Sequence, residues 1–254
     1  MLKTERHQLL IELINNEKKV LAKELATRLN VSEDTIRRDL RELDQKKLIR
    51  RVHSGAVQIG PAETMFQYRK NRHLREKRLL AKKAVELVHE DSVILIDGGT
   101  TNLAFANALP QDFRATVITN SPPIAIALEM HENIELILLG GTLNRKYMVT
   151  MGIELAEKIS KIRADFYIEG VYNIDIATGL TVPTLEESLL KKYMAEVSAE
   201  TIGLITSEKL DTISNHVIGP VSILDSIVTT SADAEKYEKA GIKVIYCKDE
   251  LFYP

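Results

Sequence analysis

Several features that would restrict the class of this 254-residue chain are missing from it. It has a single cysteine, Cys247, which excludes a disulfide bond within the chain. No apolar run reaches the roughly 18 residues that a membrane-spanning helix needs. Residues 1–6 are too polar to begin a secretory signal peptide. We therefore expect a cytoplasmic protein that has no membrane partner.

Signatures of cofactors and of catalysis are also missing. The sequence has neither the G-x-x-x-x-G-K-[ST] loop that cradles nucleotide phosphates nor the G-x-G-x-x-G turn of dinucleotide sites. It has no G-x-S-x-G nucleophile elbow. Cys247 has no CxxC partner, and the histidines lack the spacing of zinc ligands; they stand at positions 7, 53, 73, 89, 131 and 216. We predict no cofactor, no metal and no catalytic residue.

Charge is unevenly distributed, although the net charge is only -2. Residues 1–83 contain 21 Lys and Arg against 11 Asp and Glu, whereas residues 84–254 contain 13 against 25. A basic front on an acidic body indicates that the front binds a polyanion. The alternative is a pair of solvated faces whose charges differ by chance. The chain is long enough for two domains.

Three short helices are predicted before residue 46. Apolar residues recur at helical spacing over residues 4–15 and again over about 22–29. Asn30 tolerates the left-handed conformation that ends a helix, and Ser32 is a typical N-cap with acidic residues after it. The buried stripe of the third helix consists of Ile36, Leu40 and Leu43. The second and third helices together indicate a helix-turn-helix.

The outer face of the third helix predicts contact with DNA. Arginine can bond guanine bidentately or hold phosphate, and serine and threonine hydroxyls suit either role. The predicted contacts are Ser32, Glu33, Thr35, Arg37, Arg38 and Arg41. The alternative is a small helical bundle with a charged exterior, which the helix lengths, the turn and the capping residues disfavour.

A β-hairpin wing is predicted next, with strands over 48–52 and 56–59 and a turn at 53–55. Its candidate contacts to the phosphate backbone are Arg50, Arg51 and His53. His53 is equally well explained as an ordinary turn residue.

The segment Val31-Ser32-Glu33-Asp34-Thr35-Ile36-Arg37-Arg38-Asp39-Leu40 resembles the N-terminal domain of DeoR-type bacterial transcription regulators. It matches that family's V-S-x-x-T-I-R-R-D-L at every fixed position. His53-Ser54-Gly55-Ala56 resembles the family's H-G-G-A and departs from it at Ser54. We expect a DNA-binding domain over residues 1–60 and a connector over 61–90. The connector contains a basic helix from about 74 to 89, which is either near DNA or simply solvated.

Residues 91–254 alternate between apolar strands and helical patterns, which predicts an α/β domain with a mostly parallel sheet. The expected strands are 93–96, 116–119, 134–139, 166–168, 202–205, 227–229 and 243–246. The expected helices are about 101–109, 121–131, 151–161, 184–199 and 233–240.

Polar or glycine-rich loops follow three of these strands, at the sheet edge where ligands of such folds bind. Glycines let the backbone approach a ligand, and helix N-termini offer N–H groups to anions. The candidate residues of these loops are Gly98, Gly99, Thr100, Thr101, Asn120, Ser121, Gly140 and Gly141. Three such loops favour a shared anion-binding crevice, whereas a single one would indicate only a turn.

These loops also resemble the DeoR-type effector domain, which belongs with the ribose-phosphate isomerase, glucosamine-phosphate deaminase and CoA-transferase-like folds. The resemblance implies a phosphorylated sugar or related anionic effector. It assigns the polar contacts to Asp97, Asn120, Glu187, Lys191 and Lys209. Asp97 is alternatively a buried carboxylate that braces its loop, and both lysines are alternatively surface residues. The sequence departs from the family at residues 170–175 and at Thr206.

These features predict a DNA-binding transcription regulator. We expect a homo-oligomeric repressor of carbohydrate or related metabolic genes, because helix-turn-helix proteins generally bind paired half-sites. Its partners would be operator DNA and the anionic effector. An enzyme with a DNA-binding appendage is a second hypothesis, with Asp97 or Glu187 as the acid or base. A DNA-packaging protein is a third, but it leaves a sensing pocket unexplained.

Overall fold

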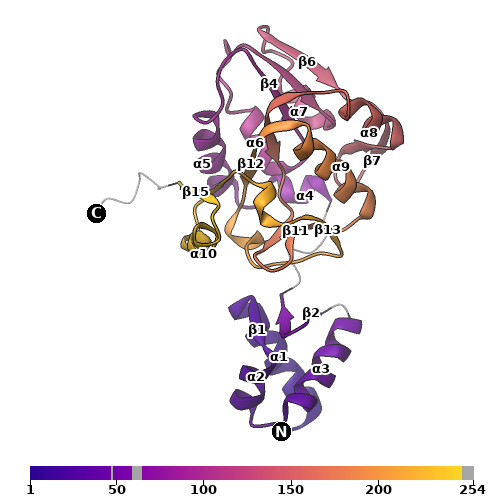
Figure 1. The fold of residues 1–254 in the computed structure, drawn as a ribbon, viewed down its shortest axis with the longest axis vertical. Coiled ribbons are helices and arrows are strands. Elements are labelled where there is room, and N and C mark those ends of the chain that lie inside the picture. The colour runs from indigo at the N-terminus through magenta and orange to yellow at the C-terminus, as the bar shows by residue number, and fades with distance from the viewer. Residues whose placement is uncertain (47, 59–64, 248–254) are drawn as a thin grey trace, which may run out of the picture.

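The computed structural model describes residues 1–46, 48–58 and 65–247. The described chain forms a small N-terminal unit, at the bottom of Figure 1, and a larger α/β unit above it. The last expected wing residue, Ile59, and the Gly60-Pro61 end of the wing domain lie outside the described residues. Among the described residues, no helix combines the length and the apolar character needed to cross a membrane.

The N-terminal unit is a winged helix-turn-helix, as predicted. Its helices are α1 (Lys3–Glu17), α2 (Ala22–Leu29) and α3 (Glu33–Gln45), and its sheet has the order β1 (Lys19–Leu21), β3 (Gly55–Val57), β2 (Arg50–Val52). Asn30 adopts the left-handed conformation, with φ 51° and ψ 49°. The Ser32 hydroxyl accepts a hydrogen bond from the Thr35 amide at 3.1 Å. Both capping predictions are therefore confirmed.

Strand β1 was not expected, because three residues between two helices carry no detectable strand period. It pairs antiparallel with β3, so the wing is part of a three-stranded sheet. Gly55 is paired with Leu21 in this sheet, and a Cβ atom on Gly55 would lie 2.0 Å from the Val20 carbonyl oxygen. Only glycine permits this close approach of the two strands. The core beneath the sheet includes Leu10, Leu25 and Ile36.

Two helices connect the units, α4 (Phe66–Lys70) and α5 (Leu74–Val85). The predicted connector helix is confirmed as α5, although it ends at Val85 instead of about residue 89. Leu80, Ala81 and Ala84 of α5 are buried in the core of the larger unit. The connector helix is thus packed on the sheet along one side, whereas α4 was not expected.

The larger unit contains a seven-stranded sheet in which every neighbouring pair is parallel. All seven expected strands are present in it, with ends that differ by up to four residues. In spatial order they are β15 (Lys243–Tyr246), β14 (Ser226–Thr229), β12 (Ser198–Leu204), β9 (Ala164–Glu169), β4 (Ser92–Ile96), β5 (Ala115–Thr119) and β6 (Ile134–Leu138).

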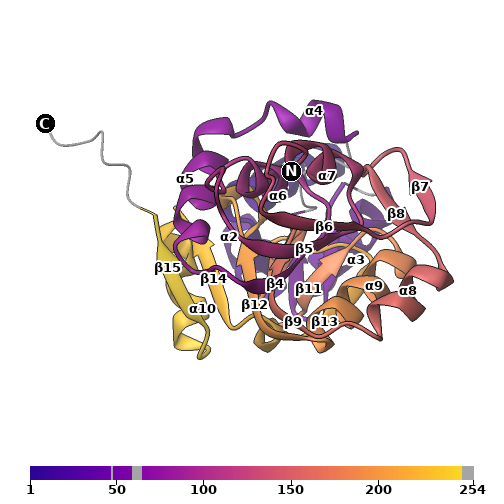
Figure 2. The ribbon, with the colours of Figure 1, turned by 90° about the horizontal axis from the view of Figure 1, so that it is seen from above.

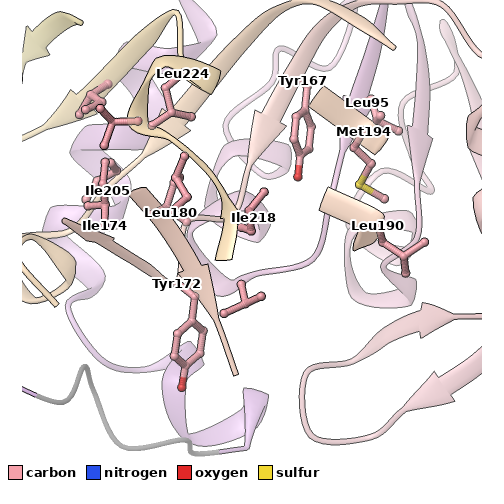
Figure 3. Packing of buried hydrophobic residues seen from close by; sticks show 14 of the residues in the cluster. Leu95, Tyr167, Tyr172, Ile174, Leu180, Leu190, Met194, Ile205, Ile218 and Leu224 are labelled. Carbon is pink, nitrogen blue, oxygen red and sulfur yellow. The ribbon is translucent and has the colours of Figure 1, made fainter. Parts of the chain in front are cut away.

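Helices cover both faces of this sheet (Figure 2). One face carries α5, α6 (Thr100–Ala106) and α7 (Pro122–Ala127); the other carries α8 (Ile153–Ile159), α9 (Leu185–Glu196) and α10 (Glu235–Lys239). The strands alternate accordingly, because Ile94 and Ile96 belong to one core and Leu95 to the other. In Figure 3, Leu190 and Met194 of α9 lie near Leu95 and Tyr167 of the sheet.

Short elements complete the unit, and the sequence pattern did not predict them. A hairpin joins β7 (Thr142–Asn144) to β8 (Val149–Met151), and a second small sheet has the order β10 (Asn173–Asp175), β11 (Gly179–Val182), β13 (His216–Gly219). Three 3₁₀ turns are η1 (Ser207–Lys209), η2 (Val221–Ile223) and η3 (Ala232–Ala234).

Candidate functional site

The first candidate surface is the exposed side of α3. Arg37, Arg38 and Arg41 are exposed, at spacings that keep them on one side of the helix. Glu33 pairs with Arg37 at 2.7 Å, and the Ser32 and Thr35 hydroxyls lie 2.8 Å apart at the N-terminal end. The structure therefore brings all six predicted α3 residues together around one exposed surface.

A partly buried ion pair joins α3 to α1. Asp39 is 2% exposed and accepts hydrogen bonds from Arg6 Nε at 2.5 Å and from His7 Nε2 at 3.0 Å. Burial raises the pKa of Asp39, but the hydrogen bonds from Arg6 and His7 outweigh it and hold that pKa below its usual value. The aspartate of the I-R-R-D-L segment thus positions the arginines beside it.

The wing residues divide into two groups. Arg51 and His53 are exposed near the turn between β2 and β3. Arg50 donates instead to the side-chain oxygen of Asn215 in the larger unit, and its guanidinium lies 3.6 Å from Asp44. In this structure Arg50 is therefore engaged between the two units.

The second candidate site is a pocket at the carboxyl ends of β4 and β9. The chain proceeds from β4 to β5 and β6 on one side and then returns to place β9 on the other side of β4. Such a reversal of strand order leaves a crevice where the two loops diverge, the usual ligand position in this class of sheet. The space amounts to about 710 Å³, part of it open to solvent.

The loops that form this crevice approach each other closely. Gly98, Gly99, Thr100 and Thr101 line it from β4, and Gly170, Val171 and Tyr172 line it from β9. A Cβ atom on Gly170 would lie 2.3 Å from the Gly98 carbonyl oxygen, so the contact requires glycine. Thr101 is 1% exposed, and its hydroxyl has no hydrogen-bond partner among the described residues. A buried hydroxyl of this kind is available to a ligand.

Four cationic side chains line the pocket, together with two carboxylates. The cations are Arg69, Arg72, Lys77 and Lys209, and the carboxylates belong to Glu187 and Glu208. The Arg69 guanidinium lies over the Tyr147 ring, 5.6 Å from its centroid. Lys77 Nζ donates to the Arg69 carbonyl at 2.7 Å, and Lys209 Nζ donates to the Val171 carbonyl.

The surroundings of the two lysines depress their pKa values. Burial is the main cause for both, and neighbouring cations add to it. The pKa of Lys77 falls to about 8 and that of Lys209 to about 7. Crowded cations in a partly dry pocket are stabilised when an anion enters, so the arrangement favours an anionic ligand.

Asp97 lies beneath the pocket and is 3% exposed. One carboxylate oxygen accepts from the Gly170 amide at 2.6 Å and from Asn102 at 2.8 Å. The other accepts from Tyr167 at 3.0 Å and from the Lys191 ammonium. Burial lowers the pKa of Lys191, but Asp97 and the nearby Glu169 and Glu187 raise it above its usual value. This geometry favours the bracing role for Asp97, and Lys191 is buried instead of lying on the surface.

The remaining predicted residues lie in different places. Asn120 lines a second, smaller hollow of about 280 Å³, part of it open to solvent, together with Asp97, Glu187 and Lys191. Ser121 is fully buried and donates to the Met148 carbonyl at 3.3 Å. Gly140 and Gly141 are exposed and line neither cavity. The three predicted loops therefore do not converge on one crevice, because β6 lies two strands away from β4.

Sequence reasoning missed several pocket residues as ligand contacts. They are Arg69, Arg72, Lys77, Tyr147, Val149, Gly170, Val171, Tyr172 and Glu208. Lys77 had a detectable signal, because it shares helical spacing with the buried Leu80, Ala81 and Ala84. A lysine on the apolar side of a helix is a candidate for a buried role.

One further carboxylate lies near the network. Glu169 is fully buried, and neither of its carboxylate oxygens has a hydrogen-bond partner within the described part of the chain. Burial raises its pKa to about 7. The positive charges of Lys191 and Lys209 partly offset that effect.

A winged helix-turn-helix with an exposed arginine surface, joined to an α/β unit with a cationic pocket, defines a DNA-binding regulator with an attached sensor. Comparison with known proteins supports this class of protein. The profile of the DeoR-like helix-turn-helix domain matches residues 6–61, and that of the DeoR C terminal sensor domain matches residues 72–231. The chain therefore belongs to the DeoR family of transcription regulators.

Two curated relatives cover nearly the whole chain. The HTH-type transcriptional regulator GlpR of Haloferax volcanii is 33% identical over 96% of this chain and 98% of that protein. The glycerol-3-phosphate regulon repressor of Escherichia coli is 32% identical over 90% of this chain and 91% of that protein. Ribose 5-phosphate isomerase A from Methanocaldococcus jannaschii aligns over 53% of each chain with 20% identity and a TM-score of 0.39, a likeness that supports no functional conclusion.

Proposed function

We propose that this regulator represses genes of carbohydrate or related metabolism and is controlled by a phosphorylated sugar or similar anionic metabolite. The proposal rests on the pocket at the carboxyl ends of β4 and β9, where the strand order reverses. Its four cations outnumber its two carboxylates, and the buried Thr101 hydroxyl offers a further polar contact. Phosphate groups favour such clusters because they present three acceptor oxygens and close to two negative charges. The name of the Escherichia coli relative, a glycerol-3-phosphate regulon repressor, supports the same class of effector.

Operator binding is assigned to the exposed side of α3 and to the wing. Ser32, Glu33 and Thr35 lie at the N-terminal end of α3, from which recognition helices reach base edges. Arg37, Arg38 and Arg41 would hold guanine or phosphate, and Arg51 and His53 would contact the phosphate backbone. A homo-oligomer fits paired half-sites.

We further propose three functional parts, with boundaries at 1–60, 61–90 and 91–254. The packing of α5 supports treating the connector as a structural part of the sensing unit. The connector also supplies Arg69, Arg72 and Lys77 to the pocket. Ligand binding would therefore involve the segment that leads directly to the DNA-binding unit.

The pocket is proposed to sense its ligand without converting it. A general base must reach the proton that it removes. Both carboxylate oxygens of Asp97 are already engaged, and Asp97 does not line the pocket. Sustained conversion of any sugar phosphate by the purified protein, lost on Glu187→Gln, would replace this proposal by the enzyme hypothesis.

Calorimetric titration of phosphorylated sugars tests the effector proposal, with and without operator DNA selected from a random pool. Coupling energies of about 1–3 kcal/mol correspond to shifts of roughly 5–150-fold in affinity, and the shift must be the same in both directions. Lys209→Met should weaken effector binding, whereas Lys158→Met on the exposed side of α8 should not. An effector affinity that operator DNA leaves unchanged would exclude equilibrium coupling by that ligand.

A further inference from the structure

Residues 207–215, which follow β12, contact both the pocket and the N-terminal unit. Glu208 and Lys209 of η1 line the pocket. The Ser207 carbonyl accepts a hydrogen bond from Lys18 Nζ at 3.0 Å, and the Asn215 side chain accepts one from Arg50. The first and last residues of this segment, Ser207 and Asn215, therefore contact the winged helix-turn-helix. Glu208 and Lys209, which directly follow Ser207, line the pocket.

Strand β10 adds a third connection between the units. Asn173 of β10 is hydrogen-bonded through its side chain to Thr212 and Ser214 of the same segment. Asp175, two residues further along β10, accepts from Lys19 Nζ at 3.0 Å. A displacement of residues 207–215 would thus also reach Lys19 through β10.

The Glu208 carboxylate lies among the four cationic side chains of the pocket, where it acts as their counter-ion. Its carboxylate lies 3.2 Å from the Arg72 guanidinium and 2.9 Å from His73 Nε2. Burial lowers the pKa values of Lys77 and Lys209, and the negative charge of Glu208 opposes that fall. The cations that would hold a ligand phosphate are therefore already partly neutralised by this side chain.

We propose that Glu208 is a built-in counter-ion that an incoming anionic ligand displaces, and that its displacement moves residues 207–215 and loosens their contacts with Lys18 and Arg50. The inference rests on the proposed function, because it requires an anionic ligand in this pocket. A phosphate carries more charge and more acceptor oxygens than one carboxylate, so it competes effectively for Arg72. Displacing Glu208 then couples occupancy of the pocket to the arrangement of the DNA-binding unit.

The local structure allows this movement. A 3₁₀ turn of three residues has poorer hydrogen-bond geometry than an α-helix, so η1 rearranges at modest cost. The Ser207 amide donates to Glu76 Oε1 at 2.7 Å, and this bond gives the turn a pivot. Rotation about that pivot would turn the Ser207 carbonyl away from Lys18.

Hydrogen exchange and calorimetry with inorganic phosphate test the inference on the full chain. Saturating phosphate should speed amide exchange in residues 207–215 and 18–21 by about fivefold or more, as expected for lost local protection. Glu208→Gln should show fast exchange in the same residues without phosphate. It should also bind phosphate about tenfold more tightly, because a charged competitor is removed. Glu154→Gln, an exposed change on α8, should match the parent protein in both measurements.

The outcomes separate this inference from the proposed function. If phosphate binds the parent protein and Glu208→Gln equally well and exchange does not change, the counter-ion role is wrong while anion sensing stands. If neither inorganic phosphate nor phosphorylated sugars bind the parent protein, the proposed function fails and this inference fails with it. Tighter binding together with faster exchange would support the proposed coupling.

Discussion

The molecule presents two cationic surfaces that are built in opposite ways. The arginines of α3 come from one short stretch of sequence and are exposed to solvent. The cations of the pocket come from residues 69–77 and from Lys209, and the two lysines among them have depressed pKa values. Exposed arginines keep their charge at any physiological pH and suit a long polyanion. Enclosed lysines suit a small anion, and their charge depends on pH and on the ligand itself.

The largest expected effect comes from removing the support of the pocket while leaving the α3 surface intact. Asp97→Ala would leave the Lys191 ammonium buried without its carboxylate partner. Breaking a buried pair in this way costs about 3–5 kcal/mol. We expect the sensor domain to unfold at much lower denaturant concentration, and the winged helix to keep its own stability. Hydrogen exchange, measured in each unit at increasing denaturant concentration, reports the stability of the sensor domain and that of the winged helix separately.

A second substitution distinguishes support from ligand contact. If Asp97 braces the loops, adding Lys191→Met to Asp97→Ala should recover part of the lost stability, because no unpaired charge then remains buried. If Asp97 instead contacts the effector, Asp97→Ala should stay stable and lose only its response to the ligand. That second result would contradict the bracing role and support Asp97 as a contact to the effector.

The next largest effect concerns operator binding. Arg37→Ala and Arg38→Ala should each weaken specific binding by about 1–3 kcal/mol while leaving the fold intact. A lost base contact would change the preferred site, whereas a lost phosphate contact would weaken all sites alike and reduce the salt dependence. Footprinting at several salt concentrations separates the two, with Arg163→Ala as an exposed control in the sensor domain. If the double variant footprints the operator like the parent, α3 is not the recognition helix.

A smaller effect is expected from pH, and only the pocket should show it. The charged form of Lys209 predominates below its pKa of about 7, and that of Lys77 below about 8. The phosphate monoester of a sugar phosphate loses its second proton near pH 6. Anion affinity should therefore fall by about tenfold between pH 6.5 and pH 8.5, as the lysines lose protons while the phosphate stays doubly charged.

Calorimetry at each pH checks the sign of this effect. Lys209→Arg should flatten the pH profile, because a guanidinium remains protonated throughout the range. A parent protein whose affinity for a sugar phosphate rises with pH, or does not change, would contradict the assignment of these lysines to the ligand.

The difference between the two surfaces also explains what the sequence could predict. The cap at Ser32, the left-handed Asn30 and the stripe through Ile36 and Leu40 act over a few residues, so the winged helix and its arginines were predictable. The seven sheet strands were predictable as well, since each contains a short run that is mostly apolar.

The pocket was only partly predictable, because it depends on which strands become neighbours. Sequence order suggested that the loops after β4, β5 and β6 form one crevice, yet the sheet places β9 beside β4. Gly170 therefore meets Gly98, and Gly140 lies on the outer edge. Arg69 and Lys209 become neighbours of this crevice although 140 residues of sequence separate them.

The smallest expected effect separates folding from recognition at a single residue of α3. The Ser32 hydroxyl caps the helix by accepting from the Thr35 amide, and it also lies at the proposed base-reading end. Ser32→Ala should cost about 1 kcal/mol of stability through the lost cap. Ser32→Asp should restore the cap and favour the helix dipole, so stability should return. The new carboxylate would face DNA phosphates, however, and operator affinity should stay low. Thermal unfolding and operator titration of both variants therefore test the two roles independently. If Ser32→Asp recovers stability and operator affinity together, Ser32 serves only as a cap.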